Sequence, residues 1–257
     1  MSTYSLNLGW LYPDLMSIYG DRGNITALTL RSEWRGIDIS IRHILPESPA
    51  LELQSCDLLF MGGAQDRQQK IVSEDLKKKS ATISQMVEKG VPGLYICGAF
   101  QFLGKYYKEA DGTIIKGLSI LNLHTVNPGF DKKRLIGNVI IKADPDYLYN
   151  DKFSQYLVGF ENHGGRTYLG QGVKPIGKVI KGFGNNGEDN TEGAVYKNSF
   201  GSYFHGPILP KNPHFADYLI SRSLEIKYGK KVALKPLDDT LEKKAHVFIA
   251  NRLGIKL

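Results

Sequence analysis

The first hundred residues alternate short apolar runs with helix-like segments, and this alternation restricts the possible folds more than any other feature. Apolar or alternating runs predict strands, and amphipathic stretches predict helices. The predicted strands are 5–11, 37–44, 56–63 and 93–97, and the predicted helices are 24–34, 71–90 and 99–110. In 71–90, Val72, Leu76, Ile83 and Val87 share one face, and Gly90 ends the helix. Strands and helices that alternate in this way form a parallel sheet covered by helices on both faces.

The second half of the chain has a different residue pattern. Short strand-like runs separated by Gly and Asn predict an antiparallel extension of the sheet, and two amphipathic helices are predicted at 213–229 and 239–254. The strand-like runs are 114–126, 134–143, 156–163, 194–198 and 202–209. We find no repeat or linker, so we expect an α/β fold with a mostly parallel sheet, in a single domain spanning 1–257.

Composition excludes several classes of protein. Hydrophobic residues make up 42% and charged residues 23% of the chain, which is ordinary for a soluble domain. No apolar run is long enough for a transmembrane helix, and the N-terminus lacks the pattern of a secretion signal, so we expect a cytoplasmic protein. The two cysteines, Cys56 and Cys97, lack C-x-x-C spacing, which argues against a disulfide framework or a zinc-thiolate site.

The net charge of +7 raises the question of nucleic-acid binding. The basic residues are nevertheless spread along the chain, and we expect them on solvated helix faces and loop tips. The main groups are 77–79, 132–133, 230–231 and 243–244. Nucleic-acid binding is therefore the weakest of the alternatives, and an acidic protein partner or a membrane-associated anionic substrate fits the charge equally well.

Cys97, in "GLYICGAFQFLG", is the strongest candidate for a reactive group. It ends a predicted strand, where open α/β sheets bind ligands, and Gly98 permits the tight turn that exposes a nucleophile. The following helix is expected to lower the pKa of the thiol. A cysteine in a strand can equally be a buried, inert residue, which is what we expect of Cys56.

A thiolate that attacks a carbonyl needs a base and an oxyanion hole. Of the six histidines, His163 and His205 each end a strand at a glycine, and we select His205 as the base; the others are expected to be structural or exposed. The loop Gly62–Gly63–Ala64 can supply backbone N–H groups for the oxyanion, with Gly98 as the second donor.

Several separated motifs carry a family likeness. "GLYICGAFQFLG", "GFENHGGRTYLG" and "SYFHGPIL" resemble the nucleophile and histidine motifs of class I glutamine amidotransferases of the cobyric acid synthase type. More narrowly, "LYPDLMSIYGDRGNI", "FMGGAQDRQQ", "GFGNNGEDNTEG" and "YKNSFGSYFHGPILPKNP" are similar to the glutaminase subunits of lipid II isoglutaminyl synthases. The likeness runs from about 6 to 229 and implies the flavodoxin-like fold of class I glutamine amidotransferases.

The resemblance implies hydrolysis of L-glutamine to glutamate and ammonia. Cys97 would be the nucleophile and His205 the acid/base, while Arg134, Gln101, Gly63 and Gly98 would bind the substrate. The ammonia would pass to a MurT-like subunit of the Mur-ligase family, forming a heterodimer that amidates D-glutamate of the lipid II stem peptide to D-isoglutamine in peptidoglycan biosynthesis. The resemblance implies no cofactor on this chain, with ATP and Mg²⁺ on the ligase. The complex would hold the chain near the inner membrane face.

The chain departs from the family pattern in three places. Gly206 and Pro207 follow His205 where many relatives have H-x-E, so either the site is a dyad or another acidic residue such as Glu161 orients the imidazole. Ala64 and Ala99 replace expected glycines. The alternatives are a glutaminase of another amidating system, such as corrinoid amidation, and a catalytically silent scaffold subunit. The role of the helical segment 230–257 stays open.

Overall fold

A computed structural model describes residues 4–18, 20–144 and 155–257 of the chain. Its largest sheet has six strands in the order β13-β14-β4-β3-β1-β2, and four neighbouring pairs are parallel while β13 runs antiparallel to β14. The strands are β1 (Tyr4–Leu11), β2 (Ile37–Ile44), β3 (Leu58–Met61), β4 (Gly93–Ile96), β13 (Ala194–Tyr196) and β14 (Ser199–Ser202). The mostly parallel sheet predicted from the sequence is confirmed.

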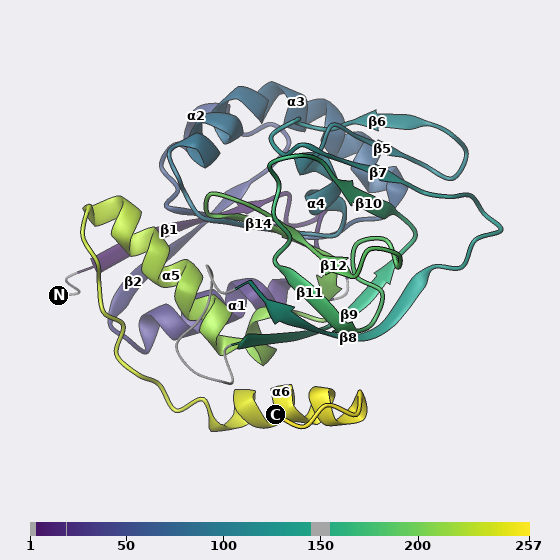
Figure 1. Cartoon of the computed structure of the whole chain (residues 1–257). Helices are drawn as coiled ribbons and strands as arrows, with labels where there is room; N and C mark the ends of the chain where they lie inside the picture. The colour runs from purple at the N-terminus through teal and green to yellow at the C-terminus, as the bar shows by residue number, and fades with distance from the viewer. Residues whose placement is uncertain (1–3, 19, 145–154) are drawn as a thin grey trace.

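Helices cover both faces of this sheet (Figure 1). On one face lie α1 (Arg22–Glu33) and α5 (Pro213–Tyr228), and on the other lie α2 (Ala50–Leu53), α3 (Asp66–Glu88) and α4 (Gly98–Leu103). The side chains predicted to share the apolar face of α3 are all buried in the main core, because their spacing places them on the side of the helix that faces the sheet.

One lysine of the group 77–79 contradicts the expectation of a solvated face. Lys79 is 2% exposed, and its ammonium donates to Asp75 and, over 2.8 Å, to the carbonyl oxygen of Pro46. The same Asp75 accepts a hydrogen bond from Tyr12. Burial is tolerated because the charge is paired and hydrogen-bonded.

Two further sheets flank the main one. The first has the order β10-β7-β5-β6 and the second β12-β11-β8-β9-β15. The first contains β5 (Tyr106–Lys108), β6 (Ile114–Lys116), β7 (Leu123–Val126) and β10 (Arg166–Leu169). The second contains β8 (Leu135–Ala143), β9 (Tyr156–His163), β11 (Gly177–Lys181), β12 (Thr191–Glu192) and β15 (Phe204–His205). The antiparallel extension is confirmed for the second sheet, in which every pair is antiparallel.

One expectation about a segment is wrong, and one strand was not predicted. The predicted helix 99–110 stops at Leu103, where Gly104 adopts an extended conformation, and 106–108 pairs as β5 instead. Residues 199–202, which lie between the predicted runs 194–198 and 202–209, form β14 in the main sheet, parallel to β4. This strand matters for function, because it brings the chain around His205 to the end of the strand that precedes Cys97.

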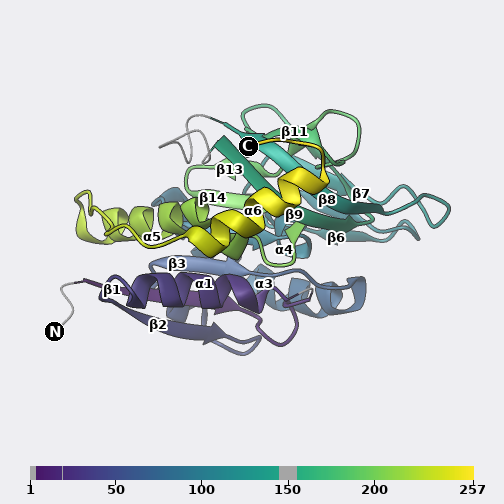
Figure 2. The same cartoon turned by 90° about the horizontal axis from the view of Figure 1, so that it is seen from below.

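The C-terminal segment packs against the second sheet (Figure 2). After the 3₁₀ turn Leu209–Lys211, α5 runs back along the main sheet, and α6 (Thr240–Arg252) lies near β8 and β9. Ala250 of α6 forms a small apolar cluster with Ile140 and Val158. Both C-terminal helices are confirmed. Among the described helices, none has the length and apolar character needed to span a membrane.

Candidate active site

Cys97 stands at a sharp turn between β4 and α4. Its backbone has φ of 53° and ψ of −106°, a left-handed conformation that non-glycine residues rarely adopt. The surrounding pairing holds it there: the Cys97 N–H donates to the carbonyl oxygen of Ser202 on β14 over 2.8 Å. The strand-turn-helix geometry expected of a nucleophile elbow is therefore present, and the residue is 7% exposed.

His205 and Cys97 both lie next to Gly63. A Cβ atom placed on Gly63 would lie 3.1 Å from His205 Cε1 and 3.2 Å from Cys97 Cβ, so a side chain at this position would have to displace its neighbours. The structure thus places a thiol at the end of a strand of the main sheet near an imidazole from the antiparallel sheet.

Asp21, a fully buried residue just before α1, was not anticipated from the sequence. Its Oδ1 lies 4.0 Å from Nδ1 of His205, and its Oδ2 accepts a hydrogen bond of 2.7 Å from the N–H of Gly63. Glu161, the acidic residue considered from sequence, instead accepts hydrogen bonds from the N–H groups of Phe183 and Gly184. Of these two carboxylates, Asp21 is the one that lies near Nδ1 of His205, at a distance longer than a hydrogen bond, and no local sequence motif predicted it.

The loop after β3 is arranged differently from the expectation for Gly63. Since the Gly63 N–H is bonded to Asp21, it is not available to an oxyanion in this structure. The backbone nitrogen of Ala64 lies 3.4 Å from the position of a Cβ on Gly98, so Ala64 is the loop residue next to the elbow. Gln69 on α3 packs against Gly98, and its Nε2 donates to the carbonyl oxygen of Ala64 over 3.1 Å.

A cavity of about 310 Å³ opens at Cys97, where the three sheets meet. It is lined by Ile18, Ala64, Gln65, Asp66, Gln69, Cys97, Gln101, Tyr107, Asn127, Arg134, Asn162, His163, Gly164 and Gly165. Its volume suits a small amino acid. Two predicted substrate-binding residues, Arg134 and Gln101, belong to this lining, whereas Asp66, Tyr107 and Asn162 were not anticipated from sequence.

Arg134 and Gln101 are held by specific hydrogen bonds. The Nε of Arg134 donates to Oδ1 of Asn162 over 2.9 Å, and its Nη2 donates to the Asn162 carbonyl oxygen over 2.8 Å. Gln101 is 3% exposed and donates to the hydroxyl of Tyr203 over 3.2 Å. The ring of His163 stacks on Tyr203 with centroids 3.6 Å apart. These contacts fix the cavity wall before any ligand enters.

Comparison with known proteins identifies the family. The model of the CobB/CobQ-like glutamine amidotransferase domain matches residues 7–213. The chain belongs to this family. It is therefore a glutamine amidotransferase, and the fold expected from the resemblance is confirmed.

Two curated relatives and one solved structure are similar to this glutamine amidotransferase. Subunit GatD of the lipid II isoglutaminyl synthase (glutamine-hydrolyzing) of Streptococcus pneumoniae is 40% identical over 238 residues, covering 93% of this chain and 88% of the relative. The GatD subunit of Staphylococcus aureus is 39% identical over 249 residues, covering 97% and 96%. A crystal structure of a glutamine amidotransferase matches with a TM-score of 0.56 and 14% identity, covering 84% and 98% of the two chains.

Burial dominates the protonation states in this amidotransferase site. It raises the pKa of the Cys97 thiol to about 12, and the charge on Asp21 adds to the shift while Arg134 opposes it. Burial lowers the pKa of His205 to about 3, with His163 and Arg134 contributing. The helix was expected to lower the pKa of the thiol, and this expectation is wrong. The increase in pKa caused by desolvation is larger than the decrease caused by the hydrogen bond from the Gly98 N–H.

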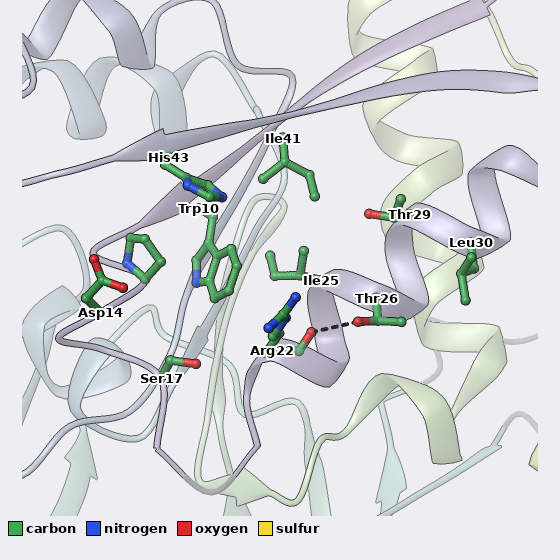
Figure 3. Close-up of a pocket in the computed structure, with 11 residues that line it drawn as sticks. Trp10, Asp14, Ser17, Arg22, Ile25, Thr26, Thr29, Leu30, Ile41 and His43 are labelled. Carbon is green, nitrogen blue, oxygen red and sulfur yellow. Dashed lines mark hydrogen bonds between the residues drawn. The ribbon is translucent and has the colours of Figure 1, made fainter.

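A second cavity, of about 580 Å³, lies between β2 and α1 (Figure 3). Its lining includes Trp10, whose ring meets His43 edge to face, and Thr26, which donates to the Arg22 carbonyl oxygen over 3.3 Å. Cys97 lines the smaller cavity but not this one, and the buried His205 is not among the described residues that line either cavity. The chemistry of the amidotransferase therefore belongs to the smaller cavity.

Proposed function

We propose that the chain is the glutaminase subunit of a lipid II isoglutaminyl synthase. It hydrolyses L-glutamine to glutamate and ammonia and passes the ammonia to a MurT-like, ATP-dependent ligase, which amidates D-glutamate of the lipid II stem peptide to D-isoglutamine. The placement of Cys97 and His205 next to Gly63 supports the glutaminase assignment. The two GatD relatives, which match nearly the whole chain, support the choice of acceptor.

The proposed reaction is an acyl transfer through Cys97. His205, neutral because burial lowers its pKa, accepts the thiol proton as the sulfur attacks the amide carbon of glutamine. The C–N bond then breaks, and His205 returns the proton to the departing nitrogen, which leaves as ammonia. Water, deprotonated by His205, attacks the γ-glutamyl thioester and releases glutamate and the free thiol.

The N–H groups of Gly98 and Ala64 are the proposed donors to the oxyanion formed at each attack. Gly98 follows the nucleophile directly, and Ala64 lies beside it, held through its carbonyl oxygen by Gln69. Because the free thiol has a raised pKa, proton transfer to His205 accompanies the attack. Asp21, facing Nδ1 of His205, is a positioning residue for this step.

Arg134 is the proposed ligand of the substrate α-carboxylate. A guanidinium suits a carboxylate because it offers several N–H donors in one plane. Asn162 occupies its Nε and one Nη2 hydrogen, while Nη1 lies near Gly164 in the cavity wall. Gln101 is part of the same cavity lining.

The proposal assigns the remaining parts of the synthase to the partner. ATP and Mg²⁺ act on the ligase, and this chain needs no cofactor for the steps above. We treat 1–257 as one amidotransferase domain in a heterodimer, cytoplasmic and held near the inner membrane face by the partner's lipid-linked acceptor.

Ammonia release from L-glutamine tests the proposal. The purified chain is assayed alone and with a co-expressed Mur-ligase-family partner, beside the variants Cys97→Ala and Cys56→Ala. We expect Cys97→Ala to abolish release and Cys56→Ala to retain it, because Cys56 is buried at the start of β3, away from the cavity. If neither preparation releases ammonia from glutamine, the glutaminase proposal is refuted, and the chain is instead a catalytically silent scaffold subunit.

A further inference from the structure

The outer face of the C-terminal helix α6 combines exposed apolar and basic side chains. Leu241 is 76% exposed and Phe248 is 60% exposed. They are seven residues apart, which places them on one line along the helix, about 10 Å from each other. Lys244 and Arg252 are exposed on the two sides of this line, and the Arg252 guanidinium lies 5.9 Å from the centroid of the Phe248 ring. These four side chains form the outer stripe of α6.

The opposite face of α6 fixes the orientation of this stripe. Ala250 is fully buried in the small apolar cluster on the second sheet, and Nδ1 of His246 donates to the carbonyl oxygen of Lys211 over 2.9 Å. Just before the helix, Asp239 accepts a hydrogen bond of 2.6 Å from Arg31 of α1. The helix is therefore formed and held in place before any ligand binds, so that use of the outer stripe carries little ordering cost.

The charge around α6 is strongly positive. Residues 230–257 contain seven basic and three acidic residues, so this segment carries +4 of the net charge of +7. Of the three carboxylates, Asp239 is paired with the buried Arg31, Glu242 is half-buried, and Asp238 precedes the helix. Within α6, which the structure describes in full, the outer stripe contains two cations and no carboxylate. A surface of this kind attracts an anionic partner.

The shape of the outer stripe favours a membrane over an acidic protein. A specific protein interface buries about 800 Å² on each side around an apolar core, whereas the stripe offers two apolar side chains in a line on a convex surface. No residue of α6 lines either cavity described above. The helix lies at the bottom edge of the molecule in Figure 1 and crosses its front in Figure 2, so a flat surface can approach it.

We propose that the outer stripe of α6 docks the chain on an anionic lipid bilayer. Leu241 and Phe248 enter the boundary between headgroups and acyl chains, while Lys244 and Arg252 contact the lipid phosphates. This goes beyond the proposed function, because it gives the chain its own contact with a membrane, independent of a ligase and of glutamine. Two inserted side chains give weak, reversible binding, which raises the concentration of the chain beside a lipid-linked acceptor.

Cosedimentation with phospholipid vesicles tests the proposal, using the full chain without ligase or glutamine. The vesicles are pure phosphatidylcholine or an equal mixture of phosphatidylcholine and phosphatidylglycerol. We expect the wild type to bind the mixed vesicles at least about tenfold more tightly than the neutral ones. Raising NaCl from about 50 mM to about 500 mM should weaken binding to the mixed vesicles at least about fivefold, because salt screens the attraction.

A pair of double variants tests the apolar contribution. Leu241→Ser with Phe248→Ser should lower partition onto the mixed vesicles about 10- to 100-fold, because it removes the inserted groups. The matched control is Leu51→Ser with Phe130→Ser, which replaces the same two residue types at exposed positions of α2 and of the loop after β7. The control should change partition less than about twofold.

A second pair tests the contribution of charge. Lys244→Gln with Arg252→Gln should lower binding to the mixed vesicles about tenfold and leave binding to the neutral vesicles unchanged. The matched control is Lys78→Gln with Arg67→Gln, which removes the same charges from exposed positions of α3. Because these cations are far from the stripe, the control should change binding less than about threefold.

Failure of the wild type to bind the mixed vesicles overturns the proposal, as do equal binding to neutral vesicles and equal losses in either control. If vesicles are not bound and both α6 variants weaken association with the Mur-ligase-family partner, the stripe is a protein interface and the membrane proposal fails. Thermal melting checks that each variant is folded. Because no measurement requires turnover, a chain that binds vesicles but releases no ammonia retains this proposal and refutes only the glutaminase.

Discussion

The Cys97 thiol should ionise far less readily than an ordinary cysteine in the isolated chain. Burial raises its pKa from 9.0 to about 12, which lowers the thiolate fraction at pH 7 from about one in 100 to about one in 10⁵. Since only the thiolate reacts with iodoacetamide, the alkylation rate should rise about tenfold per pH unit from pH 7 to 9.5, without a plateau.

Alkylation followed by peptide mapping measures this for both thiols in one sample. The slope against pH is the diagnostic quantity, because restricted access to a buried sulfur scales the rate equally at every pH. Asp21→Asn should speed alkylation of Cys97 about three- to tenfold at pH 9, since it removes a negative charge that raises this pKa. Asp57→Asn is the matched control, because the charge on Asp57 acts on Cys56 instead.

A plateau below about pH 8.5 for Cys97 would refute the reasoning. It would mean that the turn into α4 stabilises the thiolate more than burial destabilises it, and that the nucleophile is already charged before glutamine arrives. An effect of Asp57→Asn on Cys97 equal to that of Asp21→Asn would instead show that the charge acts through general destabilisation.

Three other outcomes follow from the same contacts. Arg31, buried on α1, donates hydrogen bonds to Asp217 of α5 and to Asp239, which precedes α6. Arg31→Ala should lower the free energy of unfolding, measured by urea titration, by about 3–5 kcal/mol. A decrease of less than about 1 kcal/mol would contradict a structural role. Burial raises the pKa of Asp21 to about 7, so the folded state keeps a proton that the unfolded state loses above about pH 4. The stability of the wild type relative to Asp21→Asn should therefore fall by up to about 1.4 kcal/mol per pH unit between pH 4 and 7 and level off above, and equal pH profiles for the two proteins would exclude this. A Cβ on Gly98 would lie 2.8 Å from Nε2 of Gln69, so Gly98→Ala should displace that side chain and lower glutamine turnover about tenfold or more, while Gly137→Ala, with open space around its Cβ, should leave turnover unchanged.

Local pattern was sufficient for most of the elements and for the choice of Cys97 as the candidate nucleophile. The alternation at 37–44 predicted β2 with its observed bounds, because successive side chains of a strand point to opposite faces of the sheet. Cys97 was selected as a candidate from its immediate neighbours, because consecutive residues predict the strand, the tight turn and the helix around it. The choice of His205 used the same kind of local signal, a strand that ends at a glycine.

Tertiary structure decided how these parts meet. The parallel pairing of β14 with β4 joins residues about a hundred positions apart, and it places His205 beside Cys97. The residue pattern within either segment does not predict which strand the other will pair with. The same holds for Asp21, which takes up the Gly63 N–H and faces the imidazole. Burial is likewise a property of the assembled sheets, and it reversed the expected direction of the Cys97 pKa. The sequence by itself determined the candidate residues of the site, and long-range packing determined their contacts and protonation, because hydrogen-bond partners and desolvation arise only when distant segments come together.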